Sequence, residues 1–367
     1  MKKITFLISS LAGGGAEGVC VNIANGLADN GWSVDLVILH THNATYLERV
    51  NPSVNLTVLN INHARSASIP LLKYILRRKP EKILIFNYEL AVLTVMLRSF
   101  FRFKVKIIAR NINTFSKNKT QPSSLWHRYI IKPLINYFYC KTDHIINQCQ
   151  AMCDDLLTVY PQLVNQTSVI YNPVAKHIEE YALNHNLTNI VKQDYLLCIG
   201  RLENQKAFHY AIEAFSKLKD SYPELRLKII GKGSLEVNLQ QIAINLGVID
   251  KVDFEGFKSD IIDYYLHAKA TLLTSLYEGF PNVLIESITL GTPVISFDCP
   301  SGPSEIIKQG INGYLVEYKN VDSFVESCHI LLKDKVKIEP ILATANAYST
   351  IVAVEQYSNL LINFKVK

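Results

Sequence analysis

Short apolar runs alternate with helical segments along almost the whole chain, and this alternation limits the possible folds more than any other feature. Apolar and β-branched runs that alternate with longer helical segments predict parallel strands joined by crossover helices. The strands predicted in the first half are 3–10, 33–39, 55–59, 82–86, 104–109, 144–146 and 167–171. Those predicted in the second half are 195–199, 226–230, 251–254, 270–274, 293–297 and 313–316. Each half therefore predicts an α/β domain.

The length of the chain predicts two domains. At 367 residues it exceeds the usual size of one hydrophobic core. The segment YNPV at 171–174 marks the boundary, because the residue before Pro173 is held extended. We predict a first domain of 1–172, a second of 173–346, and a last segment of 347–367 that contains a helix from Ser349 to about Leu361.

Cysteine usage and hydropathy limit the cellular setting. The seven Cys are scattered without a C-x-x-C pair, which favours a reducing compartment over disulfides or a zinc site. The opening MKKITFLISS runs directly into a glycine loop and predicts a strand rather than a signal peptide. The most apolar region, 83–101, contains Asn87, Glu89 and Arg98, so we expect a strand and a helix there rather than a membrane span. These features predict a cytoplasmic protein.

Positive charge is concentrated in one part of the chain. Residues 61–150 contain sixteen Lys and Arg against three Asp and Glu, a local charge of +13, whereas the whole chain carries +6. Basic and aromatic residues are interleaved there: Arg77, Arg78, Lys79, Arg98, Phe100, Phe101, Arg102, Phe103, Lys104, Lys106 and Arg110. This pattern is typical of a surface for anionic lipids or another polyanion. Nucleic acid would also fit the charge, and a solvated face without a partner is the alternative.

The decapeptide YEGFPNVLIE at 277–286 predicts an anion site at the start of a helix. Pro281 suits the first helical position, which leaves Glu278 in the preceding loop. The backbone N–H groups of the next three residues then lack intrahelical partners at the positive end of the helix dipole, where a diphosphate fits. These residues are Asn282, Val283 and Leu284.

Two carboxylates flank this predicted anion site. Helical side chains tilt toward the helix N-terminus, so Glu286 can approach the same ligand as Glu278. Ionised carboxylates accept strong hydrogen bonds from hydroxyl groups, and a nucleoside diphosphate sugar carries hydroxyls at both ends. The alternative for an isolated E-x7-E is an exposed helix with solvated Glu side chains.

A glycine loop after the first strand allows a different interpretation. Gly13, Gly15 and Gly18 match G-x-G-x-x-G between a strand and a helix, as in dinucleotide-binding folds. A nicotinamide site also needs an acidic residue at the end of the second strand, but that strand ends at His40 and has Asp35 inside it. We therefore favour close approach of another ligand to bare backbone over NAD binding.

Several motifs together resemble one enzyme family. The run SLYEGFPNVLIESITLGTPVISFDCPSGPSEIIKQGINGYLV at 275–316 resembles the donor-binding segment of retaining glycosyltransferases of family four. Four further segments along the chain agree with this resemblance: GGGAEG at 13–18, VIYNPV at 169–174, IGRLENQK at 199–206 and IIGKG at 229–233. The resemblance implies the GT-B fold, with two Rossmann-like domains facing across a cleft and a last helix that crosses back to the first domain.

The resemblance also implies roles for individual residues. Arg201 and Lys206 would neutralise the diphosphate, while Glu278 positions sugar hydroxyls and Glu286 binds ribose. A nucleophilic role for Glu278 is chemically conceivable, since retaining glycosidases use two close carboxylates. Further residues would contact the donor: Gly15, Gly256, Phe257, Gly279, Phe280, Pro281, Asn282, Val283 and Leu284. The chain has no D-x-D, so we expect no divalent metal and no other cofactor.

The acceptor is predicted to bind the first domain. The polar loop 110–124 follows a strand end, where open α/β sheets bind ligands, and makes Arg110 and Asn111 acceptor-side candidates. A mobile surface loop is an equal alternative. GPSEII at 302–307 resembles enzymes that build O-antigen or capsule on polyprenyl diphosphate carriers.

We therefore expect a retaining transferase that uses a UDP-sugar and a lipid-linked oligosaccharide. It would be bound peripherally to the inner face of the cell membrane and would not bind nucleic acid. The alternatives are a nucleotide-sugar epimerase of the same architecture, a nicotinamide oxidoreductase and a noncatalytic polyanion-binding protein.

Overall fold

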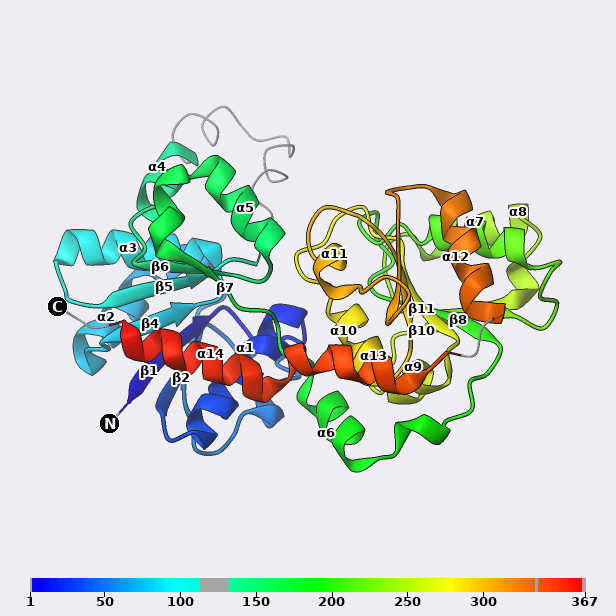
Figure 1. The fold of residues 1–367 in the computed structure, drawn as a ribbon. Coiled ribbons are helices and arrows are strands. Elements are labelled where there is room, and N and C mark those ends of the chain that lie inside the picture. The colour runs from blue at the N-terminus through cyan, green and yellow to red at the C-terminus, as the bar shows by residue number, and fades with distance from the viewer. Residues whose placement is uncertain (1, 113–131, 334–335, 365–367) are drawn as a thin grey trace. The chain divides into compact units, whose positions relative to one another are not determined.

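The computed structural model describes residues 2–112, 132–333 and 336–364. The chain forms two compact units (Figure 1). Unit 1 consists of residues 1–175 and 350–367, and unit 2 of residues 176–349. These boundaries lie three residues beyond those predicted. Val174 stays with unit 1 because its carbonyl accepts from Asn22 Nδ2 (3.3 Å), and buried Tyr348 stays with unit 2 because its hydroxyl donates to the Glu305 carbonyl (3.3 Å).

Unit 1 is built on a seven-stranded parallel sheet of order β3-β2-β1-β4-β5-β6-β7. The strands are β1 (Lys3–Ile8), β2 (Ser33–Ile38), β3 (Asn55–Val58), β4 (Lys82–Ile85), β5 (Lys106–Arg110), β6 (His144–Asn147) and β7 (Thr167–Val169). Successive side chains of a strand point to opposite faces, so Phe6 and Leu7 belong to different hydrophobic clusters. The sheet is therefore buried on both faces.

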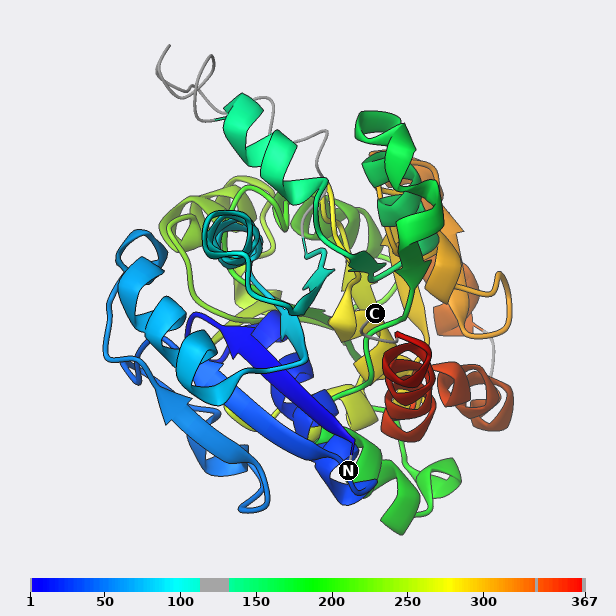
Figure 2. The same ribbon diagram turned by 90° about the vertical axis from the view of Figure 1, so that its left-hand side faces the viewer.

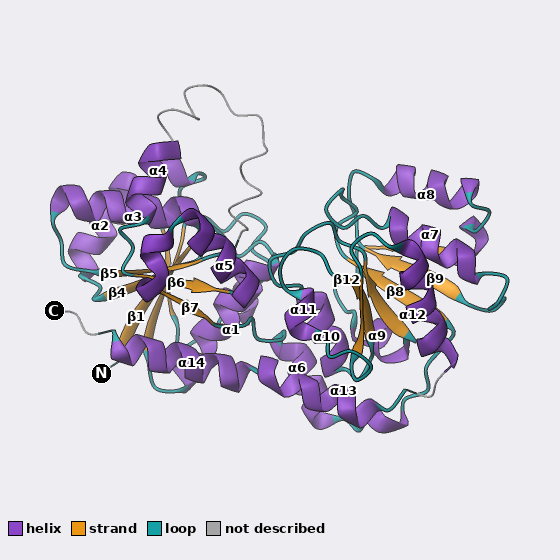
Figure 3. Cartoon of the chain, turned by 45° about the horizontal axis from the view of Figure 1, so that its top comes forward, coloured by secondary structure: helices purple, strands orange, loops and turns teal. Residues whose placement is uncertain are grey.

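Two helical layers cover this sheet (Figure 3). The layer that packs with Phe6 consists of α1 (Gly15–Asp29) and α14 (Thr350–Asn363). The layer that packs with Leu7 consists of α2 (Ser68–Arg78), α3 (Tyr88–Phe101), α4 (Lys132–Tyr139) and α5 (Gln150–Val159). Helix α14 is the last helix of the chain, yet it lies along α1. Gly26 of α1 makes this contact close, because a Cβ there would lie 2.4 Å from Val354 Cγ2.

Unit 2 is built on a six-stranded parallel sheet of order β10-β9-β8-β11-β12-β13. The strands are β8 (Tyr195–Ile199), β9 (Arg226–Ile230), β10 (Val252–Gly256), β11 (Ala270–Leu273), β12 (Val294–Phe297) and β13 (Gly313–Val316). The helices are α6 (Lys176–Asn184), α7 (His209–Leu218), α8 (Glu236–Asn245), α9 (Ile262–His267), α10 (Asn282–Thr289), α11 (Pro303–Ile306), α12 (Val321–Lys333) and α13 (Ile338–Ala345).

The predicted α/β fold class is confirmed. Each predicted strand corresponds to an observed strand whose ends differ by two residues at most. The loop expected at 110–124 lies largely outside the described residues, as does the first part of the helix expected from Leu125.

Strand order also indicates where ligands can bind. In an open parallel sheet, a ligand crevice forms at the carboxyl ends of the two strands where the direction of winding reverses. This reversal lies between β1 and β4 in unit 1 and between β8 and β11 in unit 2.

Candidate active site

The predicted donor residues of unit 2 gather where its winding reverses. The loop after β8 contains Arg201 and Lys206, and the loop after β11 contains Glu278 and leads into α10. Because β8 and β11 are neighbours, these two loops emerge side by side at the carboxyl edge. The topology thus brings together two motifs that are about seventy residues apart in sequence.

A short ion pair joins the two loops. Lys206 Nζ donates to Glu278 Oε1 at 2.7 Å, and the two side chains are 15% and 8% exposed. Ser275 Oγ donates to the same carboxylate oxygen at 2.6 Å. A buried ion pair is stable only when further hydrogen bonds satisfy its groups, and Ser275 supplies one of them. Two donors, Lys206 Nζ and Ser275 Oγ, therefore fix the orientation of the Glu278 side chain.

Backbone and side-chain hydrogen bonds hold the same loops in register. Gln205 Nε2 donates to the Tyr277 carbonyl (3.0 Å), and Leu276 N donates to the Gln205 carbonyl (2.8 Å). Thr274 Oγ1 donates to the Lys206 carbonyl (3.1 Å). These hydrogen bonds hold the ammonium group of Lys206 in position before a ligand binds, since neither loop can move without breaking them.

Close packing of glycines places the loop after β8 against the loop after β9. A Cβ at Gly231 would lie 1.8 Å from the Gly200 carbonyl oxygen, and one at Gly233 would lie 2.3 Å from that of Leu202. The Glu203 carboxylate reinforces this contact by accepting from Ser234 N (2.9 Å) and Ser234 Oγ (2.8 Å). The hydrogen bond from the Ser234 backbone N–H lowers the pKa of the Glu203 carboxyl most, and the bond from the Ser234 hydroxyl lowers it further. The loop that carries Lys206 is thus fixed from two sides.

Glu286 lies on α10 in a half-buried position. The hydroxyl of fully buried Tyr265, on α9, donates to Glu286 Oε2 at 2.9 Å. Burial raises the pKa of the Glu286 carboxyl above its ordinary value, against the lowering effects of the Tyr265 hydrogen bond and the Lys206 charge. The positive charge of Lys206 therefore acts on both carboxylates of the E-x7-E motif: it pairs with Glu278 and favours the ionised form of Glu286.

The start of α10 differs in detail from the prediction. Pro281 is the N-cap rather than the first helical residue, with φ −77° and ψ 94°. The helix begins at Asn282, and Leu284 N donates to the Pro281 carbonyl at 3.0 Å. The predicted set of three unpaired N–H groups is therefore wrong at Leu284. The ψ angle of Pro281 is extended, which moves the helix start by one residue.

The remaining predicted donor residues of unit 2 border this region. Gly256 ends β10 with φ +67° and accepts from Gly231 N at 2.9 Å. Phe257 follows it and is 70% exposed. Phe280 is buried, with its ring centroid 5.7 Å from that of Tyr348.

Arg201, the second predicted cation of the site, is exposed, and its guanidinium lies 3.5 Å from Gln205 Oε1. The loop residue Gly279 and the helical residue Val283 complete the set.

The predicted residues of unit 1 have a different environment. Arg110 ends β5 and is 2% exposed; its Nε donates to Tyr357 Oη (2.8 Å) and its Nη2 to Asn172 Oδ1. Asn111 is 3% exposed and donates to Asn147 Oδ1 (3.0 Å). These contacts give both residues structural partners, and their acceptor role stays a prediction. Gly15 is the first residue of α1, and its proximity to the donor also stays a prediction.

The basic patch expected from sequence is smaller in the structure. Arg98 and Lys106 both pair with Asp143, the latter at 3.1 Å. Arg110 is buried against Tyr357. The sequence pattern overestimated the free charge because Asp143 lies far along the chain but next to these side chains in the fold.

The described part of the chain has neither a metal-binding cluster nor a membrane-spanning helix. Residues 2–112, 132–333 and 336–364 contain no cluster of three His, Cys, Asp or Glu side chains suited to a metal ion. Within the same part of the chain, no helix is both long and apolar enough to cross a membrane.

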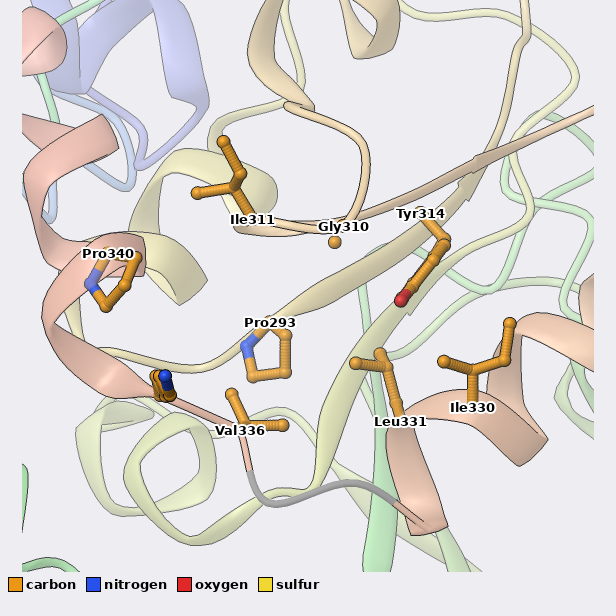
Figure 4. Close-up of a pocket in the computed structure, with 10 residues that line it drawn as sticks. Pro293, Gly310, Ile311, Tyr314, Ile330, Leu331, Val336 and Pro340 are labelled. Carbon is orange, nitrogen blue, oxygen red and sulfur yellow. The ribbon is translucent and has the colours of Figure 1, made fainter.

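A cavity of about 330 Å³ lies at the opposite edge of the sheet of unit 2, where β12 and β13 begin (Figure 4). Apolar side chains such as Pro293, Ile311 and Leu331 line it. It does not contribute to the candidate active site, which lies at the carboxyl ends of the strands.

Comparisons with known proteins agree with the geometry. The family described as "Glycosyl transferases group 1" matches residues 182–348, and "Glycosyltransferase Family 4" matches residues 13–176. Anabaena Alr3699/HepE, solved in complex with UDP, shares the fold with a TM-score of 0.76 at 19% identity, over 99% of this chain and 100% of that one. This chain is a GT-B glycosyltransferase.

Two curated relatives are similar in sequence. An "uncharacterized glycosyltransferase" of Haemophilus influenzae is 26% identical to this glycosyltransferase, over 91% of each chain. The second relative, from Campylobacter jejuni, is 28% identical over 59% of each chain. Its name is N-acetylgalactosamine-N,N'-diacetylbacillosaminyl-diphospho-undecaprenol 4-alpha-N-acetylgalactosaminyltransferase.

Several residues of this site were not predicted from the sequence. Ser275 stands three residues before Glu278, so its proximity could have been anticipated. Tyr265 and Ser234 had no such signal, because each reaches its carboxylate from another element of the fold.

Proposed function

We propose that this glycosyltransferase moves a hexose or N-acetylhexosamine from a UDP-sugar to a polyprenyl-diphosphate-linked oligosaccharide in surface polysaccharide synthesis. Three facts support the proposal: the arrangement of Lys206, Glu278 and Glu286, the UDP in the Anabaena neighbour, and the diphospho-undecaprenol in the name of the Campylobacter relative. The relatives supply the chemical classes of donor and acceptor, and the geometry supplies the residues.

The observation that carries the proposal is the Lys206–Glu278 pair at the reversal point of the sheet. A diphosphate that enters there would take the ammonium group of Lys206 as its counter-ion, and Glu278 would keep the hydrogen bond from Ser275. The Glu278 carboxylate, no longer paired with Lys206, would then accept hydrogen bonds from the sugar hydroxyls. Preorganised positive charge at the diphosphate stabilises the negative charge that develops as the sugar leaves.

The reaction can be written without an enzymic nucleophile. The bond between the anomeric carbon and the diphosphate oxygen breaks, and the acceptor oxygen bonds to the same face of that carbon. The configuration is retained because the new bond forms on the face that the diphosphate leaves. The proton of the acceptor hydroxyl passes to the departing diphosphate. In this scheme Glu286 accepts hydrogen bonds from ribose, oriented by Tyr265, and Arg201 adds positive charge at the diphosphate.

The proposed reaction uses no divalent metal, since the cations of unit 2 take the role of neutralising the leaving group. We also propose that the acceptor is presented at the cytoplasmic face of the cell membrane, because a polyprenyl chain is held in a bilayer.

The test is calorimetric binding of UDP, GDP and NAD in EDTA, followed by transfer assays with UDP-sugars. We expect UDP to bind the wild type and to bind Lys206→Ala at least tenfold more weakly, a change of about 1.4 kcal/mol. A strict requirement for added Mg²⁺ or Mn²⁺ would contradict the metal-free scheme. Binding of NAD with neither diphosphate would contradict the donor assignment. Conversion of donor to a new sugar nucleotide without acceptor would identify an epimerase.

A further inference from the structure

Two segments of unit 1 carry exposed basic and apolar side chains together. They are LRRK at 76–79, at the end of α2, and FFRFK at 100–104, at the end of α3 and the turn after it. We call these nine residues the edge patch. It contains five Lys and Arg, three Phe and one Leu, and no acidic residue. Its composition therefore combines charge with aromatic and aliphatic surface.

The fold places the two segments side by side. Helix α2 leads into β4 and α3 leads into β5, and Lys82 of β4 pairs with Lys106 of β5 in the parallel ladder. The two helix ends that precede these neighbouring strands therefore lie at the same edge of the sheet, and α2 packs against α3. Figure 2 looks toward this edge of unit 1.

The apolar side chains of the edge patch are exposed to solvent. Phe100 is 72% exposed, Phe101 is 55% exposed and Leu76 is 51% exposed. Each belongs to a regular helix whose opposite side packs in the core, so their exposure does not come from a disordered loop. Two adjacent exposed phenylalanines are costly in water unless a partner covers them.

The basic side chains of the edge patch make no ion pair with the described residues. Arg77, Arg78, Lys79, Arg102 and Lys104 are exposed, whereas nearby Arg98 and Lys106 share Asp143 and Lys82 Nζ donates to the Leu361 carbonyl (2.6 Å). Cations near helix C-termini offset the helix dipole, which accounts for part of this charge. It does not account for the exposed phenylalanines beside them.

We propose that the edge patch is the surface by which this glycosyltransferase docks onto an anionic lipid bilayer. The inference rests on the proposed function, since a lipid-linked acceptor requires access to a membrane. The basic groups contact the lipid headgroups, and Phe100, Phe101 and Leu76 enter the interface between headgroups and acyl chains. An aliphatic residue on the outer side of a helix favours lipid over nucleic acid, which binds exposed aromatics by stacking in a groove.

The test measures co-sedimentation of the full chain with phosphatidylcholine vesicles, with and without an equal share of phosphatidylglycerol. We expect binding that requires phosphatidylglycerol and weakens with salt. Arg77→Glu/Arg78→Glu should lower the affinity at least tenfold, and Phe100→Ser/Phe101→Ser should lower it severalfold. Lys79 and Arg102 are left unchanged because both have positive φ, of 49° and 52°.

Matched substitutions in unit 2 provide the controls. Lys308→Glu/Lys333→Glu makes the same change in net charge on exposed residues, and Leu183→Ser/Val237→Ser removes apolar side chains that are 77% and 78% exposed. Both control variants should bind vesicles as the wild type does. All variants should keep the wild-type affinity for UDP, which shows that they are folded.

Several outcomes would overturn the inference. These are absence of vesicle binding, equal binding to vesicles without phosphatidylglycerol, and edge-patch variants that bind as well as their controls. Binding of poly(U) RNA through the same residues without vesicle binding would assign the surface to nucleic acid instead. Vesicle binding by a protein that does not bind UDP would refute the proposed function and leave the docking surface intact.

Discussion

Arg110 in unit 1 and Lys206 in unit 2 occupy similar places in similar sheets but have opposite kinds of partner. Each lies at or just beyond the carboxyl end of a central strand. Arg110 is 2% exposed and bonds to a phenol and an amide, whereas Lys206 is 15% exposed and bonds to the Glu278 carboxylate. Neutral partners fix a cation in place. A charged partner in an accessible loop can be replaced by another anion.

The difference separates a structural cation from a functional one. Tyr357, the phenol that binds Arg110, comes from α14, so this arginine connects the sheet of unit 1 to the last helix of the chain. One nitrogen of Arg110, Nη1, is buried without a hydrogen-bond partner among the described residues. Such a group contributes to packing at some cost in desolvation. Lys206 instead lies where a substrate diphosphate can replace Glu278 as its counter-ion.

The largest effect is expected from Lys206→Ala. Transfer should fall at least tenfold, because the counter-ion of the leaving group is lost. The thermal midpoint should fall as well, because the buried Glu278 carboxylate loses its ammonium partner. The comparison is sharpened by Lys217→Ala, whose ammonium group pairs with Asp322 at 2.6 Å on an exposed surface and should leave transfer unchanged. For both variants, steady-state rates with a UDP-sugar measure transfer, and calorimetry with UDP measures binding. Unchanged transfer in Lys206→Ala would remove this lysine from the diphosphate site.

Lower stability without any loss of UDP affinity is expected for Arg110→Met. The substitution leaves the Tyr357 hydroxyl and the Asn172 carbonyl oxygen buried without their donor, which should lower the free energy of unfolding of unit 1 by about 1–3 kcal/mol. UDP affinity should stay at the wild-type value. Urea unfolding and UDP calorimetry measure the two quantities, with Tyr357→Phe as a milder variant that removes the phenol alone. Weakened UDP binding at full stability would break the distinction between the two cations.

The smallest effect is expected from Glu286→Gln and depends on pH. Because burial raises the pKa of Glu286 in the folded state, the unfolded chain releases this proton first as pH rises above the ordinary value of 4.5. The free energy of unfolding then decreases with rising pH, and the decrease is complete above the raised pKa. Gln removes this dependence, and its amide oxygen can still accept from Tyr265.

Glu286→Gln should therefore gain thermal midpoint relative to the wild type as pH rises through this window, and should bind UDP a few-fold more weakly. Melting curves at several pH values with Tyr265→Phe as a comparison provide the measurement. A difference that does not depend on pH would show that Glu286 titrates normally.

Sequence periodicity was sufficient for the fold because both sheets are parallel and buried on both faces. Strand β8 is a continuous apolar run between polar turns, and its limits agree with the prediction residue by residue. The prediction was less accurate where a backbone angle decides the boundary, as at Pro281, or where a side chain fixes it, as at Tyr348. Such contacts come from distant residues and leave no periodic signal.

The sequence by itself determined the class of the fold, the position of the YEGFPNVLIE segment at a helix start and the excess of positive charge in the first half of the chain. It could do so because these properties depend on neighbours along the chain. Only the tertiary structure decided which charges are free. Asp143 neutralises Arg98 and Lys106, α14 buries Arg110, and Lys206 meets Glu278 across two strands. The free energy of a charge depends on what surrounds it in space, and the winding order of the strands sets those surroundings.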